Sequence, residues 1–105
     1  MKILLDQGTP VPLRRHLHPH AVDTAAERGW SELGNGDLLD QAEANAYHAL
    51  ITTDQNLKYQ QDLAGRAVRI LVLMTTSWPR IQKKVDRVLD TLEAMGSGGY
   101  AEVAF

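Results

Sequence analysis

The chain has 105 residues, of which 44% are hydrophobic and 23% charged, a composition typical of one small globular domain with its own core. Eleven basic and thirteen acidic residues give a formal net charge of −2, so the bulk charge does not indicate a nucleic-acid-binding protein. Disulfides and thiolate metal sites are excluded, because there is no cysteine. No apolar run is long enough for a signal peptide or a membrane span, so we expect a cytoplasmic protein without a membrane partner.

The first half of the chain predicts two strands and two helices. A short apolar strand is expected over residues 2–5 (KILL). Thr9 and Pro10 then indicate a helix start, with the threonine as N-cap and the proline in the first turn. A weaker strand follows at residues 21–24. After turn-rich glycine segments we expect a helix over residues 37–47, because its leucine and alanine side chains fall on one face.

The second half continues the same alternation of strand and helix. ALITT, residues 49–53, predicts a buried strand, and a brief helix is expected over residues 57–63. The strongest strand pattern is AVRILVLM at residues 67–74. One long amphipathic helix is expected after it, with Ser77 as N-cap. GSGG ends this helix, and a last strand is expected over residues 100–105.

Strands that alternate with helices along a chain are typical of a parallel sheet wrapped by helices. The sequence has no internal repeat, low-complexity segment or interdomain linker. We therefore expect a single α/β domain over residues 1–105, with three layers. Its sheet should be mainly parallel, with four to five strands and helices on both faces.

Three acidic residues are expected at the edge of the sheet where ligands bind in such folds. Asp6 follows the first strand and Asp54 the third, so both should reach the edge formed by the carboxyl ends of the strands. Asp37 lies in the first turn of the helix that leads to the third strand, where it suits a helix cap as well as a ligand. Carboxylates together with hydroxyl and amide groups favour Mg²⁺ or Mn²⁺. The accompanying groups are Gln7, Thr53, Asn56 and Thr75.

The segments MKILLDQGTPVPLRRHL, GW, GNGDLL and LITTDQNLKYQQ resemble the small PIN-like domains of bacteria, and the resemblance extends over residues 1–93. It implies a parallel-sheet α/β fold and Mg²⁺-dependent ribonuclease activity, in some members as the toxin of a toxin–antitoxin pair. Under this resemblance Asp6 matches the first acid of the family site and Asp54 the late one. Asp37 matches the middle acid, with Glu43 as its substitute. RNA and an antitoxin protein are the implied partners.

The chain departs from the PIN-like pattern at two positions, which leaves two other functions open. Gln7 and Asn56 stand where related sequences often have acids. A PIN-like module that binds or dimerises without cutting RNA is therefore one alternative. The other is a receiver-like domain, with Asp54 as phosphoacceptor between Asp6 and Thr75. Receivers, however, carry a second acid beside the first and a lysine after the fifth strand, and both are missing here.

Basic side chains, histidines and the last strand carry the remaining expectations. Arg14, Arg15 and Lys58 are expected near the acidic edge, where they are candidates for phosphate contacts. HLHPH is expected at the opposite edge as a solvated turn. If residues 100–105 form an edge strand, they offer a surface for a homodimer. A basic stripe is also expected on the long helix as a solvated flank, formed by Arg80, Lys83, Lys84 and Arg87.

Overall fold

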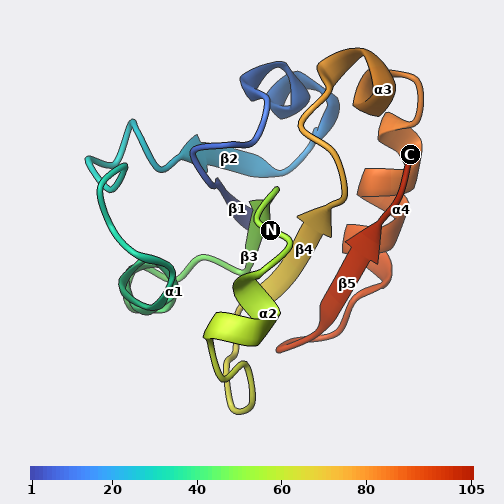
Figure 1. The fold of residues 1–105 in the computed structure, drawn as a ribbon. Coiled ribbons are helices and arrows are strands. Elements are labelled where there is room, and N and C mark those ends of the chain that lie inside the picture. Colours follow the sequence, from blue (N-terminus) through green and yellow to red (C-terminus); the bar gives the residue numbers. More distant parts are fainter.

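In the computed structural model, which describes residues 1–105, five parallel strands form one sheet with the order β2-β1-β3-β4-β5 (Figure 1). Helices cover both faces of this sheet, so the predicted three-layer α/β fold is confirmed. The strands are β1 (Lys2–Leu5), β2 (Ala21–Thr24), β3 (Ala49–Thr52), β4 (Arg69–Leu73) and β5 (Tyr100–Val103).

The helical segments differ from the predicted ones at several places. The helix expected over residues 37–47 spans Asn35–Ala44 instead, and Ser77 makes no side-chain cap. Thr9 is not a side-chain N-cap, because its buried hydroxyl donates to the carbonyl oxygen of Ile51 (3.1 Å) instead. The expected long helix is divided by Lys83 and Lys84, so the basic stripe does not lie on one helix face. The brief helix ends at Gln60. The segments are η1 (Val11–His16, a 3₁₀ helix), α1 (Asn35–Ala44), α2 (Leu57–Gln60), α3 (Trp78–Gln82) and α4 (Val85–Ala94).

None of these helices is long and apolar enough to cross a membrane. The last element, β5, pairs only with β4 and therefore lies at an edge of the sheet, as the expectation for residues 100–105 requires.

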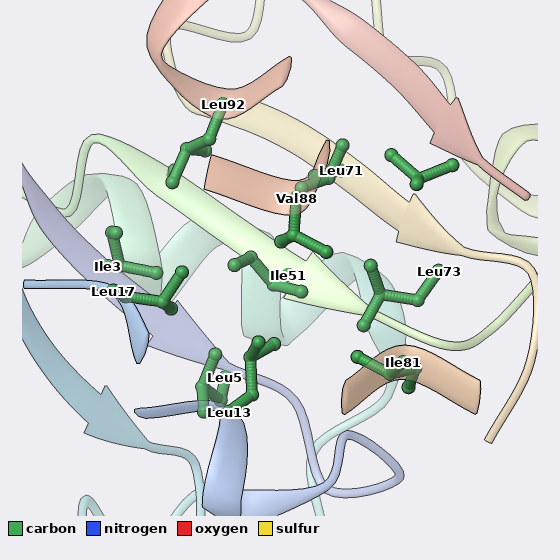
Figure 2. Packing of buried hydrophobic residues seen from close by; sticks show 12 residues of the cluster. Ile3, Leu5, Leu13, Leu17, Ile51, Leu71, Leu73, Ile81, Val88 and Leu92 are labelled. Carbon is green, nitrogen blue, oxygen red and sulfur yellow. The ribbon is translucent and has the colours of Figure 1, made fainter. Parts of the chain in front are cut away.

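Alternating side chains on each strand divide the core between the two faces. On β3, Ile51 packs toward η1, α3 and α4, while Leu50 packs toward α1 and α2. Figure 2 shows the cluster on the face covered by η1, α3 and α4, with Ile51 at its centre and Val88 of α4 and Ile81 of α3 among its members. Because both faces are covered, the central strands are apolar throughout, and polar groups are left to the strand ends.

The strand order creates a switch point at the carboxyl ends of β1 and β3. The chain leaves β1 toward one side of the sheet, to β2, and leaves β3 toward the other side, to β4. Ligands of open α/β sheets bind in the crevice outside the strands at such a point. Pairing of Leu5 with Ile51, continued by the Asp6 amide donating to the Ile51 carbonyl (2.9 Å), brings the two loops together.

Candidate functional site at the β1–β3 switch point

Asp6 is the first residue after β1, and local contacts fix both oxygens of its carboxylate. Oδ1 accepts a hydrogen bond from the backbone amide of Gln7 (2.7 Å). Oδ2 accepts one from the hydroxyl of Thr52 at the end of β3 (2.8 Å). The Gln7 side chain itself is exposed. Asp6 is therefore held toward the neighbouring strand rather than turned freely into solvent.

Asp54 follows β3 by two residues and is also fixed on both carboxylate oxygens. Oδ1 accepts from the backbone amide of Asn56 (2.9 Å), a local turn that aspartate commonly forms. Oδ2 accepts from the side-chain amide of Asn35 at the start of α1 (2.7 Å). The role of Asn56 in holding this carboxylate is thus carried by its backbone, while its side chain is exposed.

Thr52 connects the two aspartates through one fully buried hydroxyl. Its Oγ1 donates to Asp6 and accepts from the backbone amide of Asp54 (3.1 Å). A single buried group thereby sets the position of one carboxylate and the backbone that carries the other. Thr53 is the threonine expected at the site from the sequence, but the alternation of side chains along β3 directs the adjacent Thr52 inward.

No basic side chain neutralises this pair of carboxylates. All ion pairs of the chain lie elsewhere, and neither Asp6 nor Asp54 takes part in one. The hydrogen bonds to both groups come from neutral amides and a hydroxyl, which leave the negative charges in place. A carboxylate offers about four lone-pair sites, so each group keeps acceptor capacity beyond these bonds.

Asn35 is a second residue of the site that the sequence analysis missed. Its side-chain amide donates to Asp54 and also to Oε1 of Gln60 (3.1 Å), so it joins the start of α1 to the last residue of α2. The only sequence signal was its place in the GNGD turn before a helix, where asparagine is common for capping alone. Only the tertiary contact reveals the link to Asp54.

The structure does not bring Asp37 or Glu43 into this cluster. Asp37 lies two residues after Asn35, which is about 200° around the helix, and it is exposed. Glu43 lies at the other end of α1, where it pairs with Arg66 (2.6 Å) and accepts from the amide of Ala67 (2.8 Å). There it connects α1 to the segment entering β4, away from the carboxyl ends of the strands.

A close loop contact and a local hydrogen bond position the two remaining hydroxyl residues. Thr53 lies against the β1–η1 loop so closely that a Cβ on Gly8 would be 2.6 Å from its Oγ1. Thr75 follows β4, and its hydroxyl accepts from the backbone amide of Ser77 (3.1 Å). Thr53 thus borders the acidic pair, whereas the hydroxyl of Thr75 has a local structural partner.

Two of the three basic residues expected near the acids are held by acidic partners. Arg14 pairs with Glu27, and Arg15 is exposed at the end of η1. Lys58 on α2 pairs with Glu102 on β5 (2.7 Å). The ion pair and hydrogen bond with Lys58 lower the pKa of Glu102, and the hydroxyl of Tyr100 lowers it further.

The Lys58–Glu102 contact fastens α2 across the sheet to its edge strand. Tyr100 donates to the same Glu102 oxygen (2.8 Å), and burial followed by this hydrogen bond raises the pKa of Tyr100 to about 12. The Lys58 contact ties α2, the helix that follows Asp54, to β5, whereas the Tyr100 hydrogen bond lies within β5.

The later part of the histidine-rich segment, which contains His20, lies at the opposite edge of the sheet, as expected, whereas His16 stacks on Trp78 at the start of α3, which follows β4 (ring centroids 5.6 Å). Nδ1 of His20 is 2.9 Å from the amino group of Met1, which precedes β1, and His18 is exposed. These residues are separated from the acidic pair by the length of the strands. They take no part in the candidate site.

The two carboxylates at the switch point are of the ligand type that a hard divalent cation prefers. Mg²⁺ is commonly bound by one or two carboxylates with water as the other ligands, and Asp6 and Asp54 supply two carboxylates without competing cations. No group of three or more histidine, aspartate or glutamate side chains is arranged to hold a metal ion. The structure contains no pocket, at this edge or elsewhere.

Comparison with known proteins leaves this geometry as the guide to function. No protein-family model matches the chain, and no curated protein or solved structure is significantly similar to it.

Proposed function

We propose that this chain is a cytoplasmic, PIN-like ribonuclease that depends on Mg²⁺ or Mn²⁺. One observation carries the proposal: two carboxylates without basic partners, Asp6 and Asp54, are coupled through the buried hydroxyl of Thr52 at the β1–β3 switch point. A pair of uncompensated negative charges at a ligand-binding edge favours a divalent cation as the missing partner.

In this function Asp6 and Asp54 hold the cation, and Thr52 and Asn35 orient the two carboxylates. A bound Mg²⁺ or Mn²⁺ supplies an activated water and stabilises the charge that develops on a phosphodiester. Thr53, which precedes Asp54 in the chain, would hydrogen-bond to that water or to the scissile phosphate. Asp37, in the first turn of α1, adds a negative charge at the same end of the helix as Asn35 without contacting Asp54.

RNA as the substrate is supported by the resemblance to PIN-like domains through the segments around Asp6 and Asp54. Arg15, exposed at the end of η1, is the basic residue free to meet a phosphate backbone, because Arg14 and Lys58 have acidic partners. An antitoxin protein that covers the acidic edge would inhibit such an enzyme.

The test is a calorimetric titration with Mn²⁺ of the wild type and of Asp6→Asn and Asp54→Asn. Asp90→Asn, which removes an exposed acid from α4 on another part of the molecule, is the matched control. We expect binding to be lost in both site variants and retained in the control, and RNA cleavage to follow the same pattern. Failure of the wild type to bind Mn²⁺ at millimolar concentration would contradict the proposal.

A receiver-like phosphoacceptor domain is a second candidate, because the strand order 2-1-3-4-5 is also that of flavodoxin-like folds, to which receivers belong. Asp54 would be the phosphoacceptor, with Thr75 after the neighbouring strand β4. Incubation with acetyl phosphate and Mg²⁺, followed by intact-mass spectrometry, tests it. A phosphoryl adduct that disappears in Asp54→Asn would support this candidate over the nuclease.

A PIN-like module that dimerises without catalysis is supported by the exposed amides of Gln7 and Asn56 and by the edge position of β5. In a homodimer, β5 would pair with a strand of a second copy. Light scattering after size-exclusion chromatography distinguishes a monomer of 11.7 kDa from a species of twice that mass. A monomer at all concentrations tested would contradict the dimer.

A further inference from the structure

The two exposed large apolar side chains of the chain both follow the acid-bearing strands. Val11 begins η1, five residues after Asp6, and is 55% exposed. Tyr59 lies on α2, five residues after Asp54, and is 78% exposed. With this exposure Tyr59 contributes little to stability through burial, and its aromatic ring lies in solvent on the helix that follows Asp54.

The surroundings of Tyr59 hold the backbone and one side of the ring in place. Its backbone amide donates to the carbonyl of Asn56 (3.0 Å), which fixes the first turn of α2. The ammonium of Lys58 lies 5.1 Å from the ring centroid and is itself held by Glu102. The ring is thus an ordered surface on a helix fastened at both ends, by Asn35 through Gln60 and by Glu102 through Lys58.

Between Asp54 and Tyr59 the chain presents two exposed amide side chains, Gln55 and Asn56. Amide groups donate and accept hydrogen bonds at once, as the edge of a nucleobase does. An aromatic ring beside such amides is the combination that proteins use for an unpaired base, which stacks on the ring while its edge is hydrogen-bonded.

We propose that Tyr59, with the amides of Gln55 and Asn56, forms a subsite that binds one unpaired nucleobase next to the acidic pair. The inference rests on the proposed function in one respect, because the base belongs to the strand whose phosphodiester lies at Asp6 and Asp54. It also assigns a role to the amide at position 56: this side chain contacts a base, while its backbone holds Asp54.

The test is binding of a short single-stranded oligoribonucleotide that contains 2-aminopurine, measured by fluorescence in Ca²⁺ in place of Mn²⁺. Tyr59→Ala removes the ring, Tyr59→Phe keeps it, and Val11→Ala is the matched control for loss of an exposed apolar side chain. We expect Tyr59→Ala to weaken binding by about 5- to 150-fold, the range for loss of one base–aromatic stack. Tyr59→Phe and Val11→Ala should bind as the wild type does, and fluorescence quenching should be lost only with the ring.

Equal binding by the wild type and Tyr59→Ala, or no binding of the oligonucleotide by the wild type, would overturn the subsite. Its failure is distinguishable from failure of the nuclease. Cleavage in Mn²⁺ with unchanged kcat/KM in Tyr59→Ala would leave the nuclease and remove the subsite. Binding that depends on Tyr59, without cleavage in Mn²⁺, would leave the subsite and remove the nuclease.

Discussion

The buried hydroxyl of Thr52, at the end of β3, donates a hydrogen bond of 2.8 Å to Asp6, which follows the neighbouring strand β1. The same oxygen accepts from the amide of Asp54, so two acids that are far apart in the sequence share one fixed partner. Because this hydroxyl is fully buried, neither the Asp6 carboxylate nor the Asp54 backbone can move away from it without leaving a polar group unpaired.

Replacing Thr52 should therefore weaken both the fold and the cation site. Thr52→Val keeps the shape but leaves the Asp54 amide without its acceptor, which should lower the free energy of unfolding by about 1–3 kcal/mol. Thr52→Ser keeps the hydroxyl and loses only a methyl group. Urea unfolding measures the stability, and Mn²⁺ calorimetry should show weaker binding for valine than for serine. Equal Mn²⁺ affinity in the two variants would show that the hydroxyl does not position the acids.

Changing Asn35 to aspartate should strengthen cation binding at the expense of stability. The substitution replaces the donor to Asp54 Oδ2 by a third negative charge at the same place. The free energy of unfolding should fall by about 1–2 kcal/mol without metal, since a hydrogen bond to a charged group is lost and the helix N-terminus offsets part of the cost. Mn²⁺ affinity should rise about tenfold through the added charge.

Asn45→Asp is the control for Asn35→Asp, because it adds the same charge at the other end of α1. Its Mn²⁺ affinity should equal that of the wild type. A similar rise in both variants would mean that net charge, not the position beside Asp54, governs cation binding.

A side chain at Gly8 should disturb the acidic pair without altering any charge. An added Cβ would lie 2.6 Å from the hydroxyl of Thr53, so Gly8→Ala should separate the two loops and cost about 1–3 kcal/mol of unfolding free energy. Thr53→Ala in the same chain should recover part of this cost, which a double-mutant cycle in urea measures. Gly96→Ala, where an added Cβ meets nothing within 4 Å, is the control.

Glu43 should make stability depend on acid pH. Burial raises its pKa, but the hydrogen bonds from Arg66 and the Ala67 amide outweigh that effect and lower the pKa below 4.5. A lowered pKa in the folded state means that the contribution is complete above pH 4.5 and is lost as the pH falls through the folded value. The unfolding free energy of Glu43→Gln, measured with urea, should therefore fall less than that of the wild type as the pH decreases below 4.5.

Glu32→Gln, which removes an exposed glutamate outside every ion pair, is the control for Glu43→Gln. Its stability should follow the wild type across the same pH range. Parallel curves for the wild type and Glu43→Gln would show that the Arg66 contact contributes nothing that depends on protonation.

The sequence by itself determined the sheet and the residues that end its strands. Apolar runs at β1, β3 and β4 are predictable because covered central strands exclude polar residues, and strand–helix alternation favours parallel pairing. This was sufficient to place Asp6 and Asp54 at one edge. The sequence did not show whether Thr9 caps a helix or makes a tertiary contact. In the structure its hydroxyl donates to the carbonyl of Ile51.

Only the tertiary structure decided which polar groups meet around the two acids. Asn35 contacts Asp54 and Asp37 does not, because the phase of α1 depends on how its apolar face packs against the sheet. Glu43 pairs with Arg66 for the same reason. Thr52 rather than Thr53 couples the acids, since the inward face of β3 is set by its neighbouring strands. Local patterns fix where a strand ends, whereas contacts across the sheet fix what its end touches.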